Sequence, residues 1–197
     1  MRATLIPHPT TADGPSVRIE ADLDQEGRSW AFVKFRLSGA ASSVRIPQRL
    51  QQLDKASQEA AETFASTRSP DLMLMEAGRT DGLWKHTCFE VFARLSDGSY
   101  AEFNISPSGE WASYGFEGYR DGMQNLGGVR IQRLGDVTGD AIEVEAILDW
   151  PGWPHVTGIG LSAVIEDVDG NISYWALAHP SDKPDFHHPD SFVLELP

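Results

Sequence analysis

The sequence of 197 residues contains a single cysteine, Cys88, and no apolar run long enough to span a membrane. One cysteine cannot form a disulfide within the chain, and this one lies in a strand-like run where a small buried residue is expected. A spanning helix needs about 18 or more consecutive apolar residues. The first residues, MRATLIPHPT, lack the charged and then apolar regions of a secretory signal. We therefore expect a cytoplasmic protein.

Positive charge is also scarce, because 16 lysines and arginines face 29 aspartates and glutamates, for a formal net charge of −13. The resulting field repels phosphate backbones and anionic lipid, so neither nucleic acid nor a membrane surface is an expected partner. The sequence has no nucleophile elbow, no phosphate-binding glycine loop and no dinucleotide fingerprint. We therefore expect a binding protein rather than an enzyme.

Most of the chain shows alternation, in which apolar residues recur at every second position within short runs of β-branched and aromatic residues. Clusters of Gly, Asp, Asn and Pro separate the runs, and those at 96–99, 106–109 and 167–171 predict hairpins. The predicted strands are 16–23, 29–37, 87–95, 99–106, 111–116, 128–134, 141–148, 158–166, 172–178 and 191–196. The pattern predicts one all-β domain over residues 1–197, a two-sheet antiparallel β-sandwich of jelly-roll type.

One segment departs from this pattern. Residues 47–69 are rich in Ala, Gln and Glu, and Leu50, Leu53, Ala56 and Phe64 recur at roughly helical spacing. The segment is predicted to be one inserted helix. It either packs on the surface, where it would cap an open end of the sandwich, or faces a partner.

The densest group of reactive and aromatic side chains is at 82–92, GLWKHTCFEVF. In an extended chain Trp84, His86 and Glu90 project from the same face. A carboxylate among apolar neighbours is costly to bury without a partner. Glu90 is therefore either hydrogen-bonded to a neighbouring strand or loop arginine, or it holds a polar ligand.

A second polar face occurs at 100–106, where Glu102 and Asn104 point away from Phe103 and Ile105. This face is either exposed to solvent or continuous with the face of Glu90. In the second case Glu90, Glu102 and Asn104 together offer the donors and acceptors that sugar hydroxyls require.

Two further positions are candidate ligand contacts. Trp175 and His179 share a face of the run 173–179, and two tryptophans can sandwich a flat apolar ring, either the C–H face of a sugar or a haem. Arg120 lies in the glycine-rich loop GYRDGM. It either contacts an anionic ligand or forms a surface ion pair with Asp121 or Glu117.

Five runs together carry a family resemblance: LWKHTCFEVF, YAEFNISPSGEWASYGF, LSAVIED, SYWALAHP and PDFHHPDSFVLEL. Over residues 82–196 the chain resembles DOMON-like proteins related to the family 9 carbohydrate-binding modules. The resemblance implies a β-sandwich in which two tryptophans stack on a sugar and a glutamate holds its hydroxyls, and Trp84, Trp175 and Glu90 match these positions. Related DOMON domains hold haem through a Met and a His. The residues available for that role are Met73, Met75 or Met123 and His86 or His179.

Three functions are therefore compatible with the sequence. The first is non-catalytic binding of a carbohydrate or a sugar-bearing metabolite, which requires Trp84 and Trp175 to face each other across a cleft. The second is haem binding, which requires a slot between a Met and a His. The third is a protein-interaction module with no small ligand, in which both tryptophans are buried.

Two other kinds of site are not expected. Asp185, His187, His188 and Asp190 are metal-ligating types, but adjacent residues of an extended chain point apart, so His187 and His188 cannot readily bind one ion together. Glu90 and Glu102 could supply the two carboxyls that glycoside cleavage requires, but no other motif supports that reaction.

Overall fold

The computed structural model describes residues 1–11, 14–25, 28–47, 78–134 and 140–195, and β-strands dominate them. Within these residues no helix is long and apolar enough to cross a membrane. The strands are β1 (Arg2–Pro7), β2 (Val17–Asp24), β3 (Trp30–Gly39), β4 (Cys88–Leu95), β5 (Tyr100–Ile105), β6 (Trp111–Phe116), β7 (Gln124–Asn125), β8 (Val129–Leu134), β9 (Ala141–Asp149), β10 (Val156–Glu166) and β11 (Ile172–Ala176). Short 3₁₀ turns occur at Pro9–Thr11, Ala41–Ser43, Leu83–Lys85, Trp153–His155 and Pro189–Ser191. The prediction of an all-β fold is confirmed.

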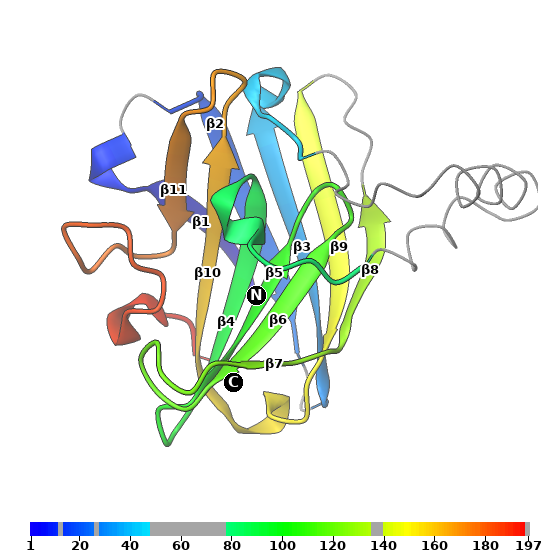
Figure 1. The fold of residues 1–197 in the computed structure, drawn as a ribbon, viewed down its shortest axis with the longest axis vertical. Coiled ribbons are helices and arrows are strands. Elements are labelled where there is room, and N and C mark those ends of the chain that lie inside the picture. The colour runs from blue at the N-terminus through cyan, green and yellow to red at the C-terminus, as the bar shows by residue number, and fades with distance from the viewer. Residues whose placement is uncertain (12–13, 26–27, 48–77, 135–139, 196–197) are drawn as a thin grey trace, which may run out of the picture.

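The strands form one antiparallel sheet in the order β7-β6-β5-β4-β10-β11-β1-β2-β3-β9-β8. β1 joins its two halves, because residues 2–5 pair with β2 while Ile6 and Pro7 pair with β11. The prediction of two separate sheets is therefore not confirmed, since a strand that changes partner along its length makes the sheet continuous. In Figure 1 the sheet is seen to double back, with β4, β5 and β6 in front of β2, β3 and β9.

The main hydrophobic core fills the space between the two halves of this sheet. Every second residue of β2, β3 and β9 is buried in it, as the period of two in a strand requires. Phe35 of β3 stacks on Phe89 of β4, with ring centroids 5.0 Å apart. Phe103 of β5 stacks on Trp153 at 5.8 Å. The side chains of opposite parity in β4 and β5 therefore point away from this core.

That outward face of β4, β5 and β6 is covered as well. β5 is buried at all of its positions, and β4 and β6 at nearly all, rather than at alternate ones. A second apolar cluster covers the face, and Leu83 and Phe192 are the loop residues that belong to it. Loops far apart in the sequence are thus packed over one region of the sheet, which is where a pocket forms.

Nine of the ten predicted strands are present, each within two residues at both ends. The tenth, predicted at 191–196, is wrong over its described residues 191–195, because a 3₁₀ turn spans Pro189–Ser191 and pairing with β10 is reduced to a bridge between Leu194 and Ile159. The sequence does not predict β1, because Leu5 is its only buried residue and no apolar alternation marks it. The predicted helix over 47–69 lies, from residue 48 onward, outside the described residues.

Candidate functional site

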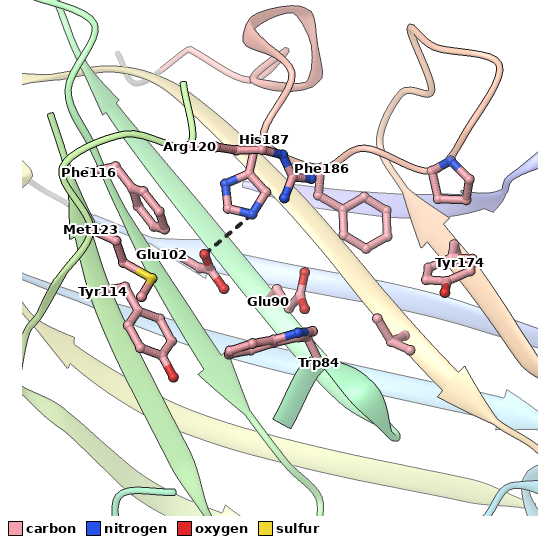
Figure 2. A pocket seen from close by; sticks show the side chains of 12 residues that line it. Trp84, Glu90, Glu102, Tyr114, Phe116, Arg120, Met123, Tyr174, Phe186 and His187 are labelled. Atoms are coloured by element: carbon pink, nitrogen blue, oxygen red, sulfur yellow. Dashed lines mark ion pairs between the residues drawn. The ribbon is translucent and has the colours of Figure 1, made fainter. Parts of the chain in front are cut away.

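A pocket of about 450 Å³ lies on the outward face of β4, β5, β6, β10 and β11. Its volume falls in the range of small-molecule sites, about 300–1,000 Å³. The strands form its floor, and residues of loops and of strand edges form its walls (Figure 2). The lining residues are Trp84, Glu90, Glu102, Tyr114, Phe116, Arg120, Met123, Val164, Tyr174, Pro184, Phe186 and His187.

Two glutamates and their hydrogen-bond donors form the polar part of the floor. Glu90 of β4 pairs with Asn104 of β5 and with Ser162 of β10, and Glu102 is two residues from Asn104 along β5. These side chains share one face because alternate residues of a strand do so. Ser162 Oγ donates to Glu90 Oε2 at 2.9 Å, and Asn104 Nδ2 donates to Glu102 Oε1 at 2.5 Å. Only 2% of Glu90 and 5% of Glu102 is exposed.

Both carboxyls are held toward their neutral, protonated form. Burial, reinforced by the neighbouring charge of Glu102, raises the pKa of Glu90 to about 8. Burial also raises the pKa of Glu102 to about 7, against the opposing effects of the Asn104 hydrogen bond and the charge of Arg120. Two adjacent carboxylates repel each other when both are charged, so the pair keeps a proton near neutral pH.

Arg120 lies in the loop that follows β6 and brings positive charge to the pocket. Its guanidinium donates to Asp185 Oδ1 at 2.9 Å, and the Tyr119 hydroxyl donates to Asp185 Oδ2 at 2.7 Å. The expected alternative partners, Asp121 and Glu117, are therefore replaced by Asp185. The reason is that the loops after β6 and β11 meet in space, which the local sequence around Arg120 does not reveal.

His187 also lines the pocket, opposite Trp84 in Figure 2. Burial, followed by the charge of Arg120, lowers the pKa of its ring to about 4. The imidazole is therefore neutral near pH 7, and its 3.7 Å approach from Nε2 to Glu102 Oε2 is a polar contact rather than an ion pair. Tyr100 Oη accepts from the Arg120 backbone N–H at 3.2 Å and lies 2.7 Å from His187 Nδ1. This geometry favours donation from Tyr100 to Nδ1, which leaves the ring proton on Nε2, facing Glu102.

Aromatic side chains form two walls. Trp84 lies in the 3₁₀ turn Leu83–Lys85, is 40% exposed, and contacts Tyr114 edge to face at a centroid distance of 5.8 Å. Figure 2 shows its ring edge-on, with one face turned toward the floor glutamates. On another side of the pocket, Tyr174 and Phe186 pack against each other at 6.1 Å. The pocket therefore combines flat apolar surfaces with buried acceptors.

The structure brings together five of the eight predicted site residues: Trp84, Glu90, Glu102 and Arg120 line the pocket, and Asn104 supports Glu102. The remaining three, His86, Trp175 and His179, do not line this pocket.

His86 follows the turn of Trp84 and is bonded to Glu166 at 2.7 Å instead of lining the pocket. Trp175 is 7% exposed and belongs to the main core, because it pairs with Ala163, whose other neighbour is the core residue Phe89. It therefore does not face Trp84. His179 contacts the Ile6 carbonyl at 2.9 Å and does not line the pocket.

Sequence reasoning missed Tyr174, Phe186 and His187 as pocket residues. Tyr174 pairs with Val164, and Val164 pairs with Cys88, so Tyr174 lies on the same face of the sheet as Cys88 and Glu90. The β11 ring that lines the pocket is therefore Tyr174 and not its neighbour Trp175, which the sequence favours. The alternation within 173–179 predicts that these two rings point apart, but it does not say which of them faces the core.

The metal-ligating types in 185–190 have other partners. Asp185 pairs with Arg120, and His188 Nδ1 accepts from the Asp190 backbone N–H at 3.2 Å. Across the described residues, no group of three or more His, Cys, Asp or Glu side chains is arranged to hold a metal ion.

Comparisons with known proteins give a likeness of fold. No protein-family model matches the chain, and no curated protein matches it in sequence. Among solved structures it is similar to a candidate carbohydrate-binding protein from Bacteroides uniformis, with a TM-score of 0.58 and 12% sequence identity. The similarity covers 98% of this chain and 84% of the other. At this identity the match supports a shared fold.

Proposed function

We propose that the pocket binds a carbohydrate or a sugar-bearing metabolite without catalysing a reaction. The observation that carries the proposal is the exposed Trp84 ring, whose face is turned toward Glu90 and Glu102 across one open pocket. Sugars present an apolar C–H face to an aromatic ring and hydroxyls around their edge. A pocket for a sugar therefore needs a flat aromatic wall beside fixed donors and acceptors.

The polar groups suit hydroxyl recognition because they are held in place before a ligand arrives. Glu90 accepts a hydrogen bond from Ser162 of the neighbouring strand β10, and Glu102 accepts one from Asn104 of its own strand β5. The ring of His187 is oriented by its contact with the Tyr100 hydroxyl. Preorganised groups lose little freedom on binding, so more of the interaction energy appears as affinity. The resemblance to DOMON-like domains and the fold of the Bacteroides uniformis protein support the same class of function.

The placement of the two glutamates favours binding over glycoside cleavage. In glycosidases the two carboxyls flank the scissile bond. Here Glu90 and Glu102 come from adjacent strands β4 and β5 and lie side by side on the floor. A sugar stacked on Trp84 would meet both from the same side, with neither placed to act from the opposite face.

The haem alternative has less support from the described residues. Met123 lines the pocket, but His86 is held by Glu166 and His179 by the Ile6 carbonyl. His187 lies in the pocket with Met123, but its Nδ1 is in contact with Tyr100. A visible absorption spectrum recorded after haem is added tests this alternative, since a Soret band would support it.

Calorimetric titration with a panel of mono- and disaccharides tests the proposal directly. We expect saturable binding of at least one sugar, weakened at least about tenfold by Trp84→Ala, because a central aromatic contact commonly carries about 2 kcal/mol or more. Trp30→Ala is the matched control. Trp30 lies on β3 in the other half of the sheet, where Arg28 stacks on it at 4.0 Å, so its loss leaves the pocket intact. Binding that is equally strong in both variants would place the ligand elsewhere.

A further inference from the structure

We infer that the pocket selects ligands carrying a positive charge, and specifically amino sugars whose protonated amine sits against Glu90 and Glu102. The inference rests on the proposed function for the sugar ring and adds the chemical group that the floor recognises. Three features of the pocket support it: the balance of charge, a Glu90 carboxyl oxygen that accepts no hydrogen bond from the described residues, and the aromatic faces beside the two glutamates.

The ionisable groups at the pocket leave an excess of negative charge. Glu90 and Glu102 lie on the floor, and the nearby cation, Arg120, is already paired with Asp185 at 2.9 Å. His187 contributes no positive charge near pH 7, because burial lowers its pKa to about 4. Near pH 7 the two floor glutamates retain a proton between them, and the negative charge that remains on the pair has no cation of its own among the described residues, because Arg120 is paired with Asp185.

One oxygen of the floor is available to a ligand. Glu90 accepts from Ser162 through Oε2, and within the described part of the chain no hydrogen bond reaches its Oε1. The residue is 2% exposed yet lines the pocket, so this oxygen has little contact with bulk water and borders the cavity. An ammonium group, with three donors, can serve Glu90 Oε1 and Glu102 together.

The aromatic walls are also suited to a cation. Trp84 turns one face toward the floor, and Tyr174 and Phe186 stand on another side. Indole faces attract ammonium groups within about 6 Å, more strongly when water is excluded. A neutral sugar would use the stacking surface and leave the negative charge of the floor uncompensated.

Binding an ammonium group must also displace a proton. Near neutral pH the two glutamates retain a proton between them, because burial raises the pKa of each. A cation placed beside them favours their charged forms, so its binding releases that proton to the buffer. The other charged groups near the pair, Arg120 and Asp185, stay charged over this range and are not the source of the proton.

Calorimetry with matched sugars tests the inference. The probes are glucosamine and galactosamine, each compared with its hydroxyl parent and its N-acetyl derivative near pH 7. We expect the amines to bind at least about tenfold more tightly than either neutral partner, because charge-assisted hydrogen bonds are roughly twice as strong as neutral ones. Glu90→Gln should remove this preference, so that the amine and its neutral partners bind the variant with similar affinity. Glu195→Gln, at an exposed position, should keep the preference.

Titrating the unmodified protein in two buffers of different ionisation enthalpy gives a second readout that does not depend on any variant folding. Amine binding should release protons, and neutral sugar binding should release fewer. If glucose and glucosamine bind equally and neither releases a proton, the inference is overturned and the proposed function stands. If cyclohexylamine binds with proton release and no sugar binds, amino sugars included, the sugar function and the preference for amino sugars are both overturned, and only a cation site at the floor glutamates stands. If nothing binds, both are overturned.

Discussion

Replacing Glu90 and Glu102 together with glutamine should make the protein more stable at alkaline pH and flatten the decline of its stability as pH rises. Glutamine keeps the shape of the side chain and an oxygen that accepts from Ser162 or Asn104. What it removes is a carboxyl whose ionisation is opposed by the fold. The variant therefore isolates the charge.

The sign follows from proton binding in the two states. A folded-state pKa raised above that of the unfolded chain means that the folded protein binds more protons, so stability falls as pH rises toward the folded pKa. With pKa values of about 8 for Glu90 and about 7 for Glu102, against 4.5 in the unfolded chain, stability should fall between about pH 6.5 and about pH 9 by about 2 kcal/mol from Glu90 and about 1 kcal/mol from Glu102.

The window avoids an opposing effect of His187. Its pKa is lowered to about 4, so its contribution to stability is complete above the unfolded pKa of 6.5 and is lost as pH falls toward 4. Below about pH 6.5 this loss and the effect of the glutamates have opposite slopes. Above about pH 6.5, the difference in the free energy of unfolding between wild type and variant measures the ionisation of Glu90 and Glu102 alone.

Urea unfolding followed by circular dichroism, at several pH values across this window, measures the effect. Wild type should lose stability relative to the Glu90→Gln/Glu102→Gln variant as pH rises, and Glu195→Gln should follow wild type. Parallel curves for wild type and the double variant would refute the reasoning, because they would mean that both carboxyls ionise as freely in the folded protein as in the unfolded chain.

Two further substitutions and one labelling experiment have distinct expected results. Trp84→Ala should weaken sugar binding in calorimetry and leave the melting temperature nearly unchanged, because the ring is 40% exposed. Trp175→Ala should destabilise the protein by about 3–5 kcal/mol in urea unfolding, since the ring lies in the main core. Cys88 should react with a thiol-specific reagent only after unfolding, because it is fully buried and burial raises its pKa well above the usual range.

The strands could be predicted from sequence because each carries its own signal. Alternation in 141–148 or 172–178 is a property of neighbouring residues, and Gly98 and Gly170 adopt positive φ in the hairpins predicted at 96–99 and 167–171. The continuous sheet could not be predicted in this way. It depends on β1 pairing both with β2, the next strand, and with β11, which is distant in sequence, and a strand with one buried residue leaves no pattern to detect.

The same distinction between local patterns and contacts distant in sequence applies to the residues of the site. Glu90, Glu102 and Asn104 were predictable as one polar face, because strand periodicity places them once the strands are paired. Trp175 was not placed correctly, because periodicity separates it from Tyr174 without saying which of the two faces the core. The link between Arg120 and Asp185 joins loops 65 residues apart, and nothing local in either loop indicates it.

The chemistry of the floor gives the last reason to regard it as a recognition surface. The hydrogen bonds that hold Glu90 and Glu102 come from Ser162 and Asn104, and both need only an acceptor oxygen, which glutamine also has. Packing does not require carboxyls either, because the two side chains are similar in size. A buried charge is unfavourable unless it is compensated, and the neighbouring guanidinium of Arg120 is held by Asp185. The property that distinguishes a carboxyl from an amide at these two positions is therefore its ability to ionise, and a ligand that brings positive charge to the pocket would favour that ionisation.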